Sequence, residues 1–364
     1  MKKFLLLFLL MGSTEAWGAH ALQKGMDLAY NAQFDQAKAV LNAYIAGNPG
    51  DPLGYIVRGT AYDWEQLVTG KKRDNEALAD YQTANKYAFL LWEKDEENVD
   101  KMVTLGNSYM FLAKKWLDLN KKSRAGLILK KCQKHMEEAI KREPKRWDAY
   151  LAIGIFNFYA ANIPPGLQFI ASLLGISGNE ATGLKQLQNT ANNPNLFQHH
   201  ALFVLTHALG EQKKNYAGAA GTLNRLIQRF PNNPHFLLVK GEHGFRMKQY
   251  AASRSAYDQF FNQCQNRTCN QRSLFLANYL YAAGYVEGGN PLEAAAYVAK
   301  ASKLDKGYYK NRTLRLHYYK GMVFRALGKD AEALKEFEKV RAKKDESKAA
   351  WELTKKELEK MGMK

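Results

Sequence analysis

The chain has 364 residues, of which 46% are hydrophobic, 24% charged and 12% aromatic, and its formal net charge is +18. This composition excludes a disordered chain, a collagen-like repeat and a membrane protein with several spans. The length allows either two or three domains or one array of small repeated units.

The first 21 residues have the pattern of a secretory signal peptide. Lys2 and Lys3 precede an apolar run over 4–11, and two small-residue triplets end at Gly18 and Ala21. The apolar run is shorter than the roughly 20 residues that a membrane-spanning helix needs. We therefore expect a signal peptide over 1–21, cleaved near 18–21, and a periplasmic or outer-envelope location in a bacterium.

A pattern of small and large residues recurs along the rest of the chain. At Gly321, which we call an anchor residue, an aromatic residue follows three positions later, Ala333 twelve positions later and Phe337 sixteen positions later. Fuller or looser copies centre on Gly25, Gly59, Gly106, Gly154, His207, Gly241 and Ala282. The intervals between the eight anchors are 34, 47, 48, 53, 34, 41 and 39 residues.

The interval of 34 residues is the length of a tetratricopeptide repeat, and the chain resembles that repeat over nearly its whole mature length. Apolar residues three and four apart, without alternation of period two, independently predict amphipathic helix pairs. The predicted fold is an all-α, TPR-like α-solenoid, a right-handed superhelix of helical hairpins. We expect about eight units over 22–346, each contacting only its neighbours, and a C-terminal capping helix over 347–364.

The longer intervals predict insertions. Residues 69–75 and 114–124 are expected to extend two turns with basic residues, and the Pro164-Pro165 pair is expected to stop a helix before an apolar helix over 167–176. The block from Gly154-Ile155-Phe156-Asn157 to Gly183-Leu184-Lys185-Gln186-Leu187 resembles the tetratricopeptide-repeat 39 family and its fungal inclusion-clearing relatives. That resemblance implies an all-helical array with a Pro-Pro break.

Basic residues gather in two segments. Residues 101–146 contain 13 Lys and Arg against 4 acidic residues, and residues 300–344 contain 14 against 5. Such clusters attract anionic lipid, an envelope polymer or an acidic protein. A solvated lysine-rich surface explains the same composition. Nucleic acid is not an expected partner, since the chain carries an export signal and no motif of stacking aromatics accompanies the charge.

Cysteine and histidine are few. In an oxidising compartment Cys264 and Cys269 are candidates for a disulfide that pins a turn, and Cys132 is expected to be a buried thiol. Metal ligation would need acidic or sulfur companions that the histidines lack, so we predict no metal site at His199, His200 and His207.

Signatures of catalysis are also missing from the sequence. We find no serine nucleophile elbow, phosphate-binding loop or zinc-protease helix, and we therefore expect neither enzyme activity nor a cofactor. An enzyme that uses the Pro-Pro segment as a lid stays open as an alternative.

Tetratricopeptide arrays usually bind partners on the inner face of the first helix of each hairpin. The anchor register places the following residues on that face: Asp63, Trp64, Asn107, Phe111, Glu242, Phe245, Arg246, Tyr318, Met322 and Arg325. Packing between units is the alternative for each of them. The predicted function is an exported, non-enzymatic scaffold that binds a protein or peptide in this groove. The alternative is a peripheral protein that binds an anionic membrane or envelope polymer through its basic patches and the 167–176 segment.

Overall fold

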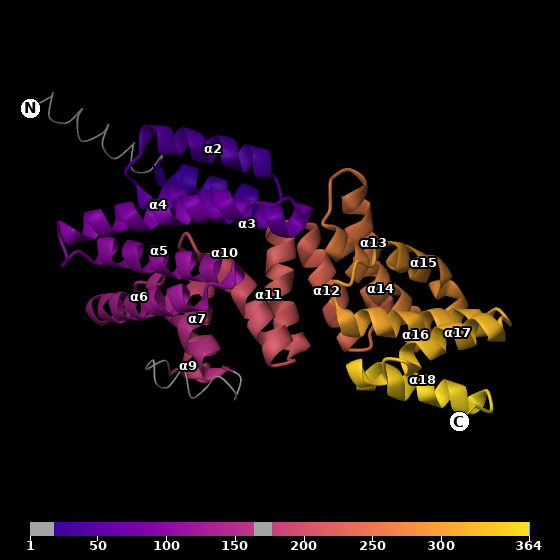
Figure 1. Cartoon of the computed structure of the whole chain (residues 1–364). Helices are drawn as coiled ribbons and strands as arrows, with labels where there is room; N and C mark the ends of the chain where they lie inside the picture. Colours follow the sequence, from indigo (N-terminus) through magenta and orange to yellow (C-terminus); the bar gives the residue numbers. More distant parts are fainter. Residues whose placement is uncertain (1–17, 164–176, 364) are drawn as a thin grey trace, which may run out of the picture. The chain divides into compact units, whose positions relative to one another are not determined.

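A computed structural model describes residues 18–163 and 177–363, and within these ranges the chain forms helices and no strand (Figure 1). The expected helical hairpins are confirmed, and they follow one another in chain order. The signal-peptide pattern before residue 18, the Pro164-Pro165 pair and the apolar run 167–176 lie outside the described residues.

The described helices pair into eight hairpins and a final helix. The pairs are residues 18–30 with α2 (Phe34–Gly47), α3 (Pro52–Thr69) with α4 (Asp74–Glu93), α5 (Val99–Asp118) with α6 (Lys122–Arg142), α7 (Ala149–Ala161) with α9 (Glu180–Asn192), α10 (Gln198–His207) with α11 (Tyr216–Arg229), α12 (Pro234–Arg246) with α13 (Tyr250–Gln265), α14 (Gln271–Glu287) with α15 (Ala295–Leu304), and α16 (Lys310–Ala326) with α17 (Asp330–Arg341). Helix α18 (Lys348–Lys360) follows and packs against α16 and α17.

The chain divides into two compact units. Unit 1 consists of Met1–Leu67 and Lys71–Asn233 and holds the first five hairpins. Unit 2 consists of Val68–Gly70 and Pro234–Lys364 and holds the last three hairpins and α18.

The anchor residues lie in the first helix of each hairpin, where the second helix approaches closely. A Cβ atom added at Gly25 would lie 2.6 Å from Leu41 Cδ2, and one added at Gly59 would lie 2.6 Å from Tyr81 Cε1. The glycines let large side chains of the second helix rest directly on the backbone of the first. The same close approach pairs Gly106 with Met136, Gly154 with Leu187, Gly241 with Tyr257 and Gly321 with Phe337.

Most of the extra residues of the long repeats lengthen the helices. The basic turn expected at 69–75 is present but covers only 70–73, and the extended turn expected at 114–124 is wrong, because only 119–121 lie between α5 and α6. Helices α3, α4, α5 and α6 have 18, 20, 20 and 21 residues, against 14 in α2. Lys, Leu, Ala and Arg are strong helix formers, and adding a residue to an existing helix costs far less than starting a new one.

Unit 1 does not follow the expectation that each hairpin contacts only its neighbours. The Tyr30 hydroxyl lies 2.9 Å from His200 Nδ1, and Asn233 Nδ2 donates to the Tyr30 carbonyl at 2.7 Å. Arg229 forms an ion pair with Asp27 at 2.6 Å. Because these contacts join the first hairpin to α10 and the end of α11, the prediction of purely nearest-neighbour packing is wrong for this unit.

The anchor packing predicts opposite effects of one methyl group at two glycines. Gly321→Ala is expected to lower the free energy of unfolding by about 1–3 kcal/mol, because the new Cβ meets the Phe337 ring. Gly221→Ala, inside α11 with nothing within 4 Å of an added Cβ, is expected to raise it by about 0.5–1 kcal/mol. Urea denaturation of both variants checks this. Equal effects at the two positions would contradict the packing, and adding Phe337→Leu to Gly321→Ala should recover stability.

The buried carboxylate of Glu336, between α16 and α17, predicts that the protein loses stability at acid pH. Burial raises the pKa of Glu336, but hydrogen bonds from His317, Lys320 and Lys339 outweigh it and lower the pKa to about 2. Because the pKa of Glu336 is lower in the folded state than its ordinary value of 4.5, the ionised carboxylate stabilises the fold above about pH 4.5. This stabilisation is lost as the pH falls towards 2. Glu336→Gln is therefore expected to cost about 1–3 kcal/mol at pH 7 and much less at pH 3.

Glu338, on the same helix, provides the matched control for this prediction. Its carboxylate is 44% exposed and pairs only with Arg341 at 3.2 Å among the described residues. Glu338→Gln is expected to change stability by less than about 0.5 kcal/mol at either pH. A constant difference between wild type and Glu336→Gln across this pH range in denaturant titrations would show that the ion pairs do not stabilise the fold.

Candidate functional site

The predicted groove residues of unit 1 lie in its interior. Trp64 on α3 is 4% exposed, and Asn107 and Phe111 on α5 are each 1% exposed. Helix α10 covers them: the Trp64 ring lies 4.9 Å from Phe203, and the Phe111 ring lies 5.2 Å from His200. These side chains therefore pack between helices of unit 1, which is the alternative that the sequence left open for the predicted groove residues.

Asp63, the remaining groove residue predicted in unit 1, belongs to a buried charge cluster. Its carboxylate forms an ion pair with Lys115 at 2.5 Å and accepts a hydrogen bond from the Tyr81 hydroxyl at 3.0 Å. Lys115 is 1% exposed and also reaches Asp74 at 3.0 Å. Burial raises the pKa of Asp74, but hydrogen bonds from Lys115 and Gln66 outweigh it and lower the pKa. The cluster therefore holds α3, α4 and α5 together.

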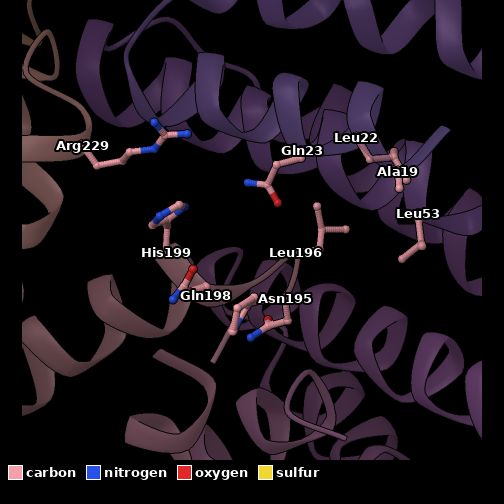
Figure 2. A pocket seen from close by; sticks show the side chains of 10 residues that line it. Ala19, Leu22, Gln23, Leu53, Asn195, Leu196, Gln198, His199 and Arg229 are labelled. Atoms are coloured by element: carbon pink, nitrogen blue, oxygen red, sulfur yellow. The ribbon is translucent and has the colours of Figure 1, made fainter. Parts of the chain in front are cut away.

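A pocket of about 640 Å³ opens in unit 1 beside the helix over 18–30 (Figure 2). Leu22 and Leu53 lie at one end, and His199 and Arg229 lie at the other. The full lining consists of Ala19, Leu22, Gln23, Leu53, Pro194, Asn195, Leu196, Gln198, His199 and Arg229. The sequence did not predict this pocket, because its walls come from residues up to about 200 positions apart.

Most polar side chains that line the pocket form hydrogen bonds with other residues of unit 1. Gln23 donates to Asp27 at 2.8 Å, Asn195 donates to the Thr190 carbonyl at 2.9 Å, and Gln198 donates to a carbonyl at 3.2 Å. Burial lowers the pKa of His199, so its ring is neutral at pH 7. The lining includes the His199 imidazole but no hydroxyl, thiol or carboxylate, and half of its residues are apolar. The pocket therefore suits an apolar group.

The predicted residues of α16 have structural partners. Tyr318 is 7% exposed, and its ring lies 6.2 Å from Phe337. Arg325 forms an ion pair with Glu357 of α18, and Met322 is half-buried. Tyr318 and Arg325 thus hold α16 against α17 and α18.

The predicted residues of α12 form the accessible part of the set. Arg246 is exposed, and Phe245 is half-buried with its ring 5.8 Å from Tyr250. The carboxylate of Glu242 pairs with Arg312 of α16 at 2.9 Å and with Arg246 at 3.4 Å. Unit 2 thus brings the three predicted residues of α12 next to an arginine of α16.

Two further residues that the sequence analysis missed extend this surface. The guanidinium of Arg312 lies over the ring of Tyr309, with its Cζ atom 4.6 Å from the ring centre. The Tyr309 hydroxyl accepts a hydrogen bond from Arg272 at 2.8 Å. We name the set Glu242, Phe245, Arg246, Arg272, Tyr309 and Arg312 the α12/α16 face. Continuing the first-helix register two turns towards the N-terminus of α14 would have pointed to Arg272. Tyr309 and Arg312 lie off that register, so only the tertiary structure places them on this surface.

The three cysteines lie in a disulfide and in the core. A disulfide joins Cys264 at the end of α13 to Cys269 in the following turn. Cys132 is buried in α6, and burial raises the pKa of its thiol to about 12. Across 18–163 and 177–363 we find no group of His, Cys, Asp and Glu arranged to hold a metal ion. No helix within these ranges is long and apolar enough to cross a membrane.

Several solved structures are similar to this chain at low sequence identity. The C-terminal part of a TPR repeat-containing protein from Cytophaga hutchinsonii is 17% identical, with a TM-score of 0.40, over 79% of this chain and 97% of that one. A tetratricopeptide repeat protein from Parabacteroides merdae is 14% identical, with a TM-score of 0.39, over 81% and 97%. Yeast Tom70 is 14% identical, with a TM-score of 0.39, over 79% and 60%.

A family model provides the assignment. No curated protein matches the chain. The model described as Iml2/Tetratricopeptide repeat protein 39 matches residues 105–287, half of the chain, including the Gly154 to Leu187 block that carries the sequence resemblance. Together with the stacked helical hairpins, this match shows that the chain is a TPR protein of the Iml2/Tetratricopeptide repeat protein 39 family.

Proposed function

We propose that this TPR protein is an exported, non-enzymatic scaffold of the bacterial envelope that binds a protein partner through the α12/α16 face. The TPR fold is a scaffold that displays side chains on successive first helices. In unit 1 that face is occupied by α10, whereas in unit 2 Arg246 is exposed and Phe245 is partly so. The accessibility of these two residues is the observation that carries the proposal.

The chemistry of this face favours an acidic partner segment with an apolar residue. Three arginines stand against one glutamate, so the face has an excess of positive charge. The planar guanidinium binds carboxylates through two parallel hydrogen bonds, which lysine cannot do. Phe245 offers an apolar contact beside them. A partner helix or extended peptide that carries Asp or Glu next to an aliphatic side chain fits this arrangement.

Site-specific crosslinking tests the partner-binding face. A benzophenone amino acid in place of Phe245 should crosslink one envelope protein, whereas the same residue in place of exposed Leu327 on the same unit should not. With that partner purified, Phe245→Ala combined with Arg246→Ala is expected to weaken binding at least about tenfold in calorimetry, because truncating central aromatic and arginine contacts typically costs over 1 kcal/mol.

The paired substitution Leu327→Ala with Lys329→Ala serves as the control for that measurement. Both residues are exposed on unit 2 and lie outside the α12/α16 face. Unchanged affinity is expected here, with circular dichroism showing native helicity in both double variants. Equal affinity of the Phe245/Arg246 variant and wild type would show that the α12/α16 face does not bind the partner.

The export proposal predicts a defined mature N-terminus. Ala21 and Leu22 are 7% and 4% exposed within the helix over 18–30, and Ala19 lines the pocket. Cleavage after Gly18 keeps Ala19, Ala21 and Leu22 in the mature helix, whereas cleavage after Ala21 removes Ala19 and Ala21. We therefore expect the mature chain from a bacterial periplasm to begin at Ala19 in N-terminal sequencing. A mature chain that begins at Leu22 would contradict this site, and an unprocessed cytoplasmic chain would contradict export.

A further inference from the structure

Positive charge is distributed unevenly over the α5–α6 hairpin. Lys114 and Lys115 pair with Asp63, and Arg142 at the far end of α6 pairs with Glu138. Between these paired groups, residues 119–136 contain no acidic residue. The first half of α6 therefore carries positive charge that its own sequence does not balance.

The basic residues of this stretch are exposed and unpaired. In the part of the chain that the structure describes, none of them lies within 4.0 Å of a carboxylate oxygen, the distance at which the ion pairs above are formed. They are Lys121, Lys122, Arg124, Lys130, Lys131 and Lys134, and all six are exposed. Unbalanced charges this close repel one another, so a nearby anionic surface lowers their free energy.

The exposed side of α6 also carries an apolar residue at its centre. Arg124, Leu127, Lys131 and Lys134 are three, four and three positions apart, which places them on one side of the helix. The opposite side packs into the hairpin through Ala125, Cys132, Met136 and Ala139. Leu127 is 71% exposed, more than any other large hydrophobic residue among those described. A leucine is thus ringed by cations on a projecting helix surface.

We propose that this surface, the α6 basic face (Leu127 with Arg124, Lys130, Lys131 and Lys134), docks on an anionic lipid bilayer. A lysine ammonium group is a compact point charge, which is attracted to the negative surface potential of anionic lipids without needing a fixed geometry. It does not form the two parallel hydrogen bonds with which arginine binds a single carboxylate. The long lysine stems let Leu127 enter the boundary between headgroups and acyl chains while the charges stay in water. A projecting helix side meets a flat surface without needing a complementary cavity. The α6 basic face belongs to unit 1 and acts independently of partner binding by the α12/α16 face.

A second exposed apolar patch of unit 1 has the opposite electrostatic setting. Phe89, Leu90 and Leu91 at the end of α4 are 39%, 40% and 37% exposed. The next residues, 92–97, contain the acidic residues Glu93, Asp95, Glu96 and Glu97 and one basic residue, Lys94. This stretch has no excess of positive charge that would attract an anionic bilayer, which makes Leu90 an apolar control for Leu127.

Vesicle sedimentation of the full chain tests the charge requirement. We expect binding to phosphatidylcholine vesicles that contain phosphatidylglycerol, none to phosphatidylcholine alone, and a steep loss with salt because screening shortens the range of attraction. Each basic residue near such a surface contributes about fivefold in affinity. Lys131→Glu with Lys134→Glu should therefore weaken binding at least about tenfold. Lys348→Glu with Lys356→Glu, the same charge change at two exposed positions of α18, should change it less than about twofold.

Insertion of the leucine is tested by its own pair of variants. An environment-sensitive NBD dye on Leu127→Cys should brighten with the anionic vesicles, and the same dye on Leu90→Cys should not; buried Cys132 is protected from labelling. Absence of binding to anionic vesicles, or binding that Lys131→Glu with Lys134→Glu leaves unchanged, would overturn the proposal. Charge-dependent binding without a dye response, together with equally strong binding to polyglutamate, would assign the face to an acidic protein and overturn it as well.

Discussion

Close approach of two helix backbones is the constraint on which the structure depends. In six hairpins a glycine of the first helix faces a Leu, Met, Tyr or Phe of the second, and an added Cβ would collide with that side chain or come within about 3 Å of it. The large side chains, including Tyr81, Tyr257 and Phe337, are buried almost completely. Since one hairpin has too little apolar surface to be stable alone, this contact must repeat along the chain for any unit to persist.

The two units use this architecture differently. In unit 1 the aromatic side chains of α3 and α5 meet α10, and Tyr30 links the first hairpin to the fifth. The surface on which other TPR arrays bind partners is here part of the core. In unit 2 the corresponding helices keep Arg246 exposed beside Glu242 and Arg312. Equivalent repeat positions therefore have different surroundings in the two units.

Ion pairing distinguishes the buried charged residues of the core from the exposed basic residues of α6. Lys115 and Glu336 are buried among opposite charges, where removing one partner would leave an uncompensated ion. Lysines 130, 131 and 134 of α6 have no such partner among the described residues and are exposed. A net charge of +18 is therefore not a uniform property of the surface.

The sequence by itself determined the helical repeats, their order and the small residues at their crossings, because helix packing between chain neighbours depends on local periodicity. It also identified Cys264 and Cys269 as a pair and Glu242, Phe245 and Arg246 as residues of one helix side. Only the tertiary structure decided that Trp64, Asn107 and Phe111 are core, since their cover, α10, comes from about 90–140 residues later in the chain. The pocket beside Leu22 and the Glu242–Arg312 pair likewise depend on contacts distant in sequence. Periodicity records which side of a helix is apolar, but it does not record which distant segment covers that side.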